Sequence, residues 1–187
     1  MAHSNKYVEE LKILHNKKTF GVTKGIPLVV NKLIEEKNIK SFLDFGAGKG
    51  GTSEYIRNQY PNVLLHTFDP ATFPNPLPEE VELTYSSDVL EHVEEHLIDE
   101  TLQDLCKRST RYQYHLIACH PAKKKLSDGR NAHLIIEKPK WWKTIIERKN
   151  TERGWRIISE DITERWVKLK KAPEIFVVKY IVYLEKV

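Results

Sequence analysis

The alternation of short β runs with helical segments is the feature that most limits how this chain can fold. Runs rich in β-branched and aromatic residues are separated by segments with apolar residues at helical spacing. We expect strands at residues 40–45, 63–68, 81–87 and 112–119, and helices at residues 4–17, 52–60, 94–108, 141–150 and from residue 27. Such alternation builds a parallel sheet covered by helices on both faces. The sequence therefore predicts an α/β fold with a doubly wound, mostly parallel sheet.

The last two predicted strands differ from the earlier ones. Residues 155–162 and 175–184 are rich in β-branched and aromatic side chains, and only a short connection separates them. Two such runs without an intervening helix pair in antiparallel fashion. We expect this antiparallel pair at the end of the sheet.

Length and composition restrict the class of protein further. The 187 residues fit a single domain, residues 1–187, with an N-terminal helix and lid at 1–25 and a core at 26–187. Because 40% of the residues are hydrophobic, the chain can bury a core. No apolar run reaches the roughly 20 residues that span a bilayer, so no membrane partner is expected. The chain has two cysteines and no apolar leader, which predicts a cytoplasmic setting.

A glycine-rich turn follows the first predicted strand. Residues 42–50 read FLDFGAGKG, with Asp44 at the end of the strand. Glycines let the backbone turn sharply and approach a ligand closely, and the helix that follows points its first amides at that ligand. Asp69 ends the second predicted strand, where a carboxylate can accept hydrogen bonds from both ribose hydroxyls of a nucleoside. These residues predict a nucleoside cofactor at the carboxyl ends of the strands.

Three motifs in this order resemble the class I S-adenosylmethionine-dependent methyltransferases, whose core is Rossmann-like. They are FLDFGAGKG at 42–50, Phe68-Asp69, and SSDVLEHV at 86–93, and the resemblance covers roughly residues 26–185. It implies a methyltransferase with S-adenosylmethionine as cofactor. The glycine loop would lie against the methionine portion, and residues 87–92 would line the wall beside the methyl group. The cofactor-binding residues so implied are Asp44, Gly46, Ala47, Gly48, Gly50, Asp69, Pro70, Ser87 and Asp88.

The sequence departs from this family after the ribose carboxylate. Four of the residues between 70 and 80 are prolines, which exclude a regular strand or helix there. The family usually has a further strand and helix at this point, so one edge strand–helix unit is missing. The family's acidic adenine contact therefore has no counterpart, and Phe68, Pro70, Phe73 and Ser87 are the candidates for flanking the adenine. The trimmed edge also leaves open a non-catalytic module that binds S-adenosylmethionine or another nucleoside.

The acceptor end of the site involves Asp88, Glu91 and His92, which would share one face of a helix starting near Asp88. Methyl transfer needs alignment of donor and acceptor and often the removal of a proton. With His133 from a later loop, we expect His92, His133 and Glu91 to act as catalytic residues. Two other interpretations stay open: Asp88 and Glu91 stabilise the start of a helix, or Glu91, His92 and His133 bind a divalent metal.

The distribution of charge bears on the acceptor. Residues 1–100 carry 10 Lys/Arg against 16 Asp/Glu, whereas residues 101–187 carry 20 against 10. An anionic partner should therefore meet the second half of the chain. The first hypothesis is methyl transfer to an oxygen or nitrogen of a small, anionic acceptor. The alternative is an RNA or nucleotide methyltransferase assisted by a divalent metal. Metal-dependent O-methyltransferases that modify RNA 3′ ends are similar in pairing an acidic-x-x-Glu-His element with a later histidine, although Asp88 stands where those enzymes have a glutamate.

Overall fold

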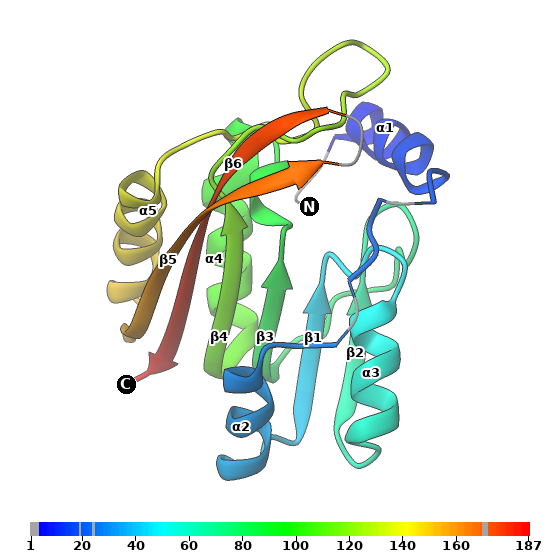
Figure 1. Ribbon diagram of the computed structural model, residues 1–187. Helices are drawn as coiled ribbons and strands as arrows, with labels where there is room; N and C mark the ends of the chain where they lie inside the picture. The colour runs from blue at the N-terminus through cyan, green and yellow to red at the C-terminus, as the bar shows by residue number, and fades with distance from the viewer. Residues whose placement is uncertain (1–3, 19, 24, 170–171) are drawn as a thin grey trace.

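A six-stranded sheet forms the centre of the described chain, which comprises residues 4–18, 20–23, 25–169 and 172–187 of a computed structural model (Figure 1). The strands are β1 Ser41–Phe45, β2 Leu64–Phe68, β3 Val81–Ser87, β4 Ser109–Ala118, β5 Trp155–Leu169 and β6 Ala172–Lys186. Their order is β2-β1-β3-β4-β6-β5. The first four are parallel, and β6 runs antiparallel to both of its neighbours. The predicted α/β class, with an antiparallel C-terminal pair, is confirmed.

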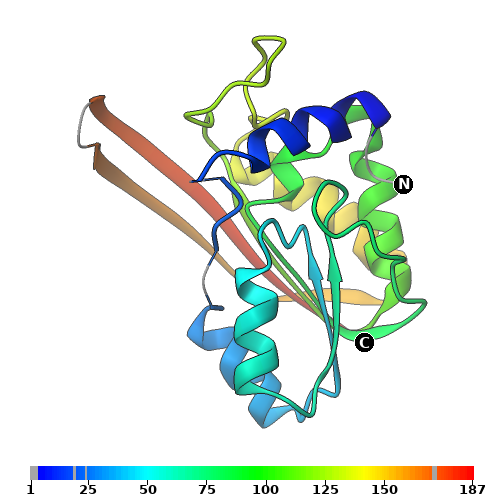
Figure 2. The same cartoon turned by 90° about the vertical axis from the view of Figure 1, so that its right-hand side faces the viewer.

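Helices cover both faces of the sheet and create two cores. On one face pack α4 Ile98–Arg108 and α5 Pro139–Thr151, and on the other α2 Leu28–Glu36 and α3 Gly51–Gln59 (Figures 1 and 2). Alternate residues of a strand point to opposite faces. Thus Leu43 belongs to the core with α4 and α5, whereas its neighbour Phe42 belongs to the core with α2 and α3. Within the described ranges, no helix has the length and apolar character needed to cross a membrane.

The edge of the sheet beside β2 is shortened, as predicted. Between β2 and β3 the described chain forms only an isolated bridge between Asp69 and Phe73, followed by irregular structure. The guanidinium of Arg108 donates to the backbone carbonyls of Leu77 and Pro78 and so ties this segment to α4. A proline-rich segment at residues 70–78 therefore takes the place of the missing strand–helix unit.

The chain after β3 differs from the expected helix. Asp88 has a φ of 55°, in the left-handed region, so no right-handed helix begins there. Short 3₁₀ turns follow at η1 Leu90–His92 and η2 Glu95–Leu97, and the predicted helix at 94–108 begins only at Ile98. The expectation that Asp88 starts a helix was therefore wrong. Its carboxylate instead accepts hydrogen bonds from Lys179 Nζ, 2.7 Å from each oxygen.

The C-terminal strands are longer than predicted. Each of β5 and β6 has 15 residues, and together they form a two-stranded ribbon that extends past the helices (Figure 2). Among the described elements no helix covers the far part of the ribbon (Figure 2), and Trp166 is 67% exposed there. Pairing between the two strands, from Trp155↔Lys186 to Leu169↔Ala172, sustains the ribbon.

Candidate active site

Two glycines of the loop, Gly46 and Gly48, have no room for a side chain. Gly46 and Gly48 have φ values of 79° and 57°, which L-residues with a Cβ rarely adopt. A Cβ on Gly46 would collide with the methyl groups of Val89, and one on Gly48 would lie 2.7 Å from the carbonyl oxygen of Gly21. The amides of Gly46 and Ala47 both donate to the carbonyl of Phe68, at 2.8 and 2.9 Å. These contacts hold β1, the loop and the end of β2 in one rigid cradle.

The ribose carboxylate implied by the sequence, Asp69, is buried beside this cradle. Its Oδ2 accepts from the amide of Gly48 at 3.0 Å, and its Oδ1 accepts from the amides of Ala71 and Thr72 at 2.9 and 3.1 Å. Nε2 of His15 lies 3.8 Å from Oδ2. Backbone amides thus fix the orientation of the Asp69 carboxylate.

A cavity of about 260 Å³ opens in front of these residues. Its wall includes most of the predicted cofactor-binding residues, namely Gly46, Ala47, Gly48, Asp69, Pro70, Ser87 and Asp88. Asp44 and Gly50 lie outside the wall. The carboxylate of Asp44 is buried, which raises its pKa to about 6, and it accepts a hydrogen bond from Ser53 Oγ at 2.7 Å. Through this hydrogen bond to Ser53, Asp44 stabilises the first turn of α3, which follows the glycine loop.

The roof of the cavity comes from α1 Asn5–His15 and the chain that follows it, above the carboxyl ends of the parallel strands (Figure 1). Thr23 lies in this wall, as expected for a residue just before the helix that covers the cofactor. The sequence did not single out the other wall residues from this segment, which are Leu11, His15, Phe20, Gly21 and Val22. The lid is held by Ser4, whose amide and hydroxyl donate to Glu94, and by Glu10, which accepts from the amide of Ser127 at 2.8 Å. Residues 1–3, 19 and 24 of the predicted lid lie outside the described residues.

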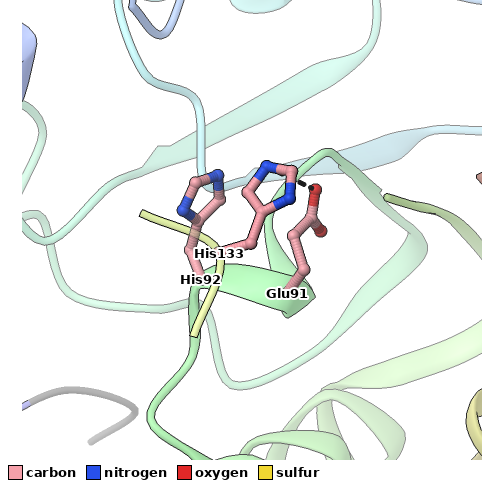
Figure 3. Close-up of side chains that lie close together, drawn as sticks. All are labelled: Glu91, His92 and His133. Atoms are coloured by element: carbon pink, nitrogen blue, oxygen red, sulfur yellow. Dashed lines mark ion pairs between the residues drawn. The ribbon is translucent and has the colours of Figure 1, made fainter. Parts of the chain in front are cut away.

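Glu91, His92 and His133 come together at the acceptor end (Figure 3). One ligand-type atom from each lies within 4.8 Å of the others. Glu91 and His92 belong to η1, and His133 comes from the loop after β4. The amides of Leu134 and Ile135 donate to the backbone carbonyl of Glu91, at 2.8 and 3.0 Å. These two bonds fasten the loop onto η1 and bring His133 to the cluster.

Backbone carbonyls set the orientation of both imidazoles. His92 Nδ1 donates to the carbonyl of Ala132 at 2.7 Å, and His133 Nδ1 donates to the carbonyl of His120 at 2.5 Å. A carbonyl oxygen only accepts, so each neutral ring carries its proton on Nδ1 and its lone pair on Nε2. Nε2 of His133 lies 4.0 Å from Glu91 Oε1. Burial lowers the pKa of His133, which favours the neutral ring with its basic Nε2.

Glu91 is the least satisfied polar side chain of the cluster. It is 0% exposed, and neither carboxylate oxygen accepts a hydrogen bond from the described residues. Burial, reinforced by the charge of Asp88, raises the pKa of this carboxyl well above its usual value. A buried carboxyl without hydrogen-bond partners is costly, so it indicates a group that acts on a proton, a ligand or a cation.

Comparisons of structure identify the architecture, whereas no protein-family model and no curated protein matches the sequence. The mitomycin 7-O-methyltransferase MmcR shares 9% identity at a TM-score of 0.53, with 97% of this chain covered. This chain spans only about half, 54%, of that protein. A putative RNA methyltransferase from Pyrococcus horikoshii shares 15% identity at a TM-score of 0.51, with 97% of this chain and 99% of that one covered.

A third neighbour was solved with S-adenosylmethionine bound. It is magnesium protoporphyrin IX methyltransferase from Synechocystis PCC 6803, with 14% identity, a TM-score of 0.50, and 99% of this chain and 86% of that one covered. These low identities bear on the fold alone. The sheet order, the glycine cradle and these neighbours agree: the chain has the class I methyltransferase fold.

Proposed function

We propose that this protein is an S-adenosylmethionine-dependent methyltransferase that methylates an oxygen or nitrogen of a small, anionic acceptor. One observation carries the proposal: His92 lines the cofactor cavity and also belongs to the cluster with Glu91 and His133. The cavity that fits a nucleoside cofactor and the groups that fit proton transfer therefore meet at a single side chain.

The residues around the cavity suit S-adenosylmethionine. Glycines without Cβ atoms leave room for close contact with the methionine portion, and the carboxylate of Asp69 offers acceptors to ribose hydroxyls. When bound, this cofactor supplies an electrophilic methyl group. The structural neighbour with bound S-adenosylmethionine supports the assignment.

The cluster suits removal of a proton from the acceptor. His133 is kept neutral by burial, so its Nε2 can take a proton at neutral pH. His92 stands between this base and the cofactor cavity and positions the acceptor. Glu91 lies beside the imidazole of His133, and its raised pKa allows it to hold or release a proton next to that ring. The positive charge of residues 101–187 supports an anionic acceptor.

The first test is calorimetric titration with S-adenosylmethionine and S-adenosylhomocysteine. Asp69→Ala should weaken binding at least tenfold, because it removes the ribose acceptors, whereas Asp161→Ala, at an exposed position of β5, serves as the matched control. The absence of binding to the wild-type protein would overturn the proposal.

The second test follows labelled methyl transfer to a panel of small carboxylates and phosphates. His92→Ala combined with His133→Ala should abolish transfer while leaving cofactor affinity within a few-fold. Unchanged transfer in this double variant would refute the roles of both histidines. Cofactor binding without transfer to any acceptor would favour the non-catalytic module instead.

A second candidate is a divalent-metal-assisted RNA or nucleotide methyltransferase. The observation in its favour is the donor set itself, two imidazole nitrogens and a buried carboxylate without hydrogen-bond partners, which fits zinc, manganese or iron. The Nδ1-to-carbonyl bonds of both histidines resemble the supports found behind metal-bound imidazoles. A bound cation would align the acceptor oxygen and lower its pKa.

Cobalt(II) provides a readout that does not depend on activity. Its visible absorption should intensify on binding to the wild-type protein and stay weak with Glu91→Gln. Methyl transfer to RNA that survives a chelator would exclude this candidate.

A further inference from the structure

Three lysines from separate parts of the chain lie together beside the roof of the cavity. Lys17 follows α1, Lys49 belongs to the glycine loop, and Lys124 comes from the loop after β4. Nζ of Lys49 donates to the backbone carbonyl of Lys17 at 2.8 Å. Nζ of Lys124 lies over the ring of Phe20, 5.2 Å from its centroid, and the amide of Phe20 donates to the same carbonyl of Lys17 at 3.3 Å. We call these three residues the lysine patch.

The lysine patch brings like charges close together. Burial lowers the pKa of Lys124, and the positive charges of Lys17 and Lys49 lower it further. Among the residues that the structure describes, no carboxylate forms an ion pair with Lys17 or Lys49. Positive charges that are held together repel one another, and a bound anion removes this repulsion. The lysine patch therefore indicates a site for an anion.

The lysine patch acts on the inside of the cavity. His15 and Phe20 belong to the cavity wall. Burial lowers the pKa of His15, and the positive charges of Lys49 and Lys124 lower it further. The ring of Phe20 also meets that of His92, with 5.8 Å between their centroids. Since the centroid of Phe20 lies 5.2 Å from Lys124 Nζ and 5.8 Å from the centroid of His92, the ammonium and the imidazole are at most about 11 Å apart.

A single loop positions both Lys124 and the acceptor end of the site. The amide of Ala132 donates to the carbonyl of Lys124 at 3.0 Å, and the carbonyl of Ala132 accepts from His92 Nδ1 at 2.7 Å. The next residue, His133, lies with Glu91 and His92. Hydrogen bonds through Ala132 thus fix the backbone of Lys124 relative to the imidazole of His92. An anion at the lysine patch is therefore within reach of the groups suited to proton transfer.

The type of residue in the lysine patch selects the kind of anion. A lysine ammonium is a compact point charge on a flexible stem, whereas the planar fork of arginine matches a carboxylate. A phosphate monoester carries close to two negative charges and offers three acceptor oxygens, which suit several ammonium groups. We propose that the lysine patch binds the phosphate of a small phosphorylated acceptor, whose atom to be methylated then lies beside His92. This rests on the proposed function and narrows its anionic acceptor to a phosphomonoester.

The first experiment measures binding by calorimetry, with and without S-adenosylhomocysteine. Phenyl phosphate is the probe, and it should bind the wild-type protein at least tenfold more tightly than methyl phenyl phosphate, a diester with one charge, or benzoate, a carboxylate. Lys124→Gln and Lys17→Gln should each weaken phenyl phosphate at least fivefold. The control with the same change in charge is Lys140→Gln, at an exposed lysine of α5 outside the cavity wall, which should change the affinity less than twofold.

The second experiment separates an acceptor phosphate from the carboxylate of the cofactor itself. The same variants are titrated with S-adenosylhomocysteine, and their thermal melting shows whether they are folded. Lys124→Gln and Lys17→Gln should change this affinity less than twofold. An equal loss of affinity for S-adenosylhomocysteine and phenyl phosphate would assign the lysine patch to the cofactor and overturn the proposal.

The outcomes distinguish this proposal from the proposed function. If the wild-type protein binds neither S-adenosylhomocysteine nor phenyl phosphate, both fail. If it binds S-adenosylhomocysteine but not phenyl phosphate, or binds benzoate as tightly as phenyl phosphate, the phosphate site alone is refuted. Binding of a uridine oligonucleotide that depends on Lys124, without binding of phenyl phosphate, would assign the lysine patch to RNA and overturn the small acceptor.

Discussion

Replacing Glu91 with methionine should stabilise the fold while removing activity. Methionine has a similar length and no polar atoms, so it can occupy the same space without unmet hydrogen-bonding capacity. Glu91 is 0% exposed, and neither of its carboxylate oxygens has a hydrogen-bond partner among the described residues. A buried polar group in this condition costs about 1–3 kcal/mol. For a chain of this size each kcal/mol shifts Tm by about 2–4 °C, so the variant should melt about 2–12 °C higher.

The pH dependence gives a second, independent signature. The pKa of Glu91 is raised in the folded protein, so the folded state holds its proton to a higher pH than the unfolded state does. The unfolded chain then binds fewer protons above the usual glutamate range, and the wild-type protein loses stability as pH rises. Glu91→Met has no such group. The stability gap between variant and wild type should therefore widen from pH 4.5 upward until the raised pKa is passed.

The assay is urea and thermal unfolding with a chelator present, so that no bound cation contributes. Glu95→Met, at an exposed glutamate in η2, is the matched control and should change Tm little. The reasoning is refuted if Glu91→Met melts at or below the wild-type temperature at pH 7.5. It is also refuted if the gap is the same at pH 5 and pH 8.

Three further predictions concern other parts of the molecule. Burial lowers the pKa of His115 to about 4, so stability should fall by up to about 3 kcal/mol as the pH drops from about 6.5 to 4; His115→Gln should flatten this dependence in urea unfolding. Gly48→Ala should weaken S-adenosylhomocysteine at least tenfold in calorimetry, because the new Cβ pushes against Gly21 and the lid; unchanged affinity would mean that the cradle yields. Glu10→Gln should speed release of S-adenosylhomocysteine in stopped-flow measurements, because it weakens the bonds from Ser127 that hold α1 down; an unaltered rate would show that α1 does not limit release.

Much of the fold could be predicted from sequence because its signals are local. Runs of β-branched and aromatic residues predict the four parallel strands, apolar residues at helical spacing predict the helices, and Pro139 marks the first residue of α5. The shortened edge was predicted from the prolines together with the resemblance to a family that usually has a strand and a helix at this point. The error came after β3, where helix-favouring residues follow Asp88. There the backbone carbonyl of Glu91 in η1 accepts hydrogen bonds from the amides of Leu134 and Ile135, which are distant in sequence. These tertiary contacts override the local preference for a helix.

The candidate site also has a part that the sequence predicts and a part that depends on tertiary packing. The positions of Glu91, His92 and His133 relative to the strand ends were enough to predict their convergence. His15 and Phe20 could not be predicted as wall residues, because their role depends on how α1 packs across the strand ends. No local pattern encodes that packing. A cavity of about 690 Å³ between the segment after β2 and α4 is likewise formed by residues from several parts of the chain, and no single motif encodes their contacts.

The hydrogen bonds between the loop after β4 and η1 have a consequence for both histidines of the cluster. His133 reaches Glu91 only while the amides of Leu134 and Ile135 hold the carbonyl of Glu91, and His92 is oriented by the carbonyl of Ala132 in the same loop. Lifting the loop removes one imidazole and releases the other. The positions of both imidazoles therefore depend on this one loop. A substitution that weakens the hydrogen bonds between the loop and η1 should disturb both histidines together.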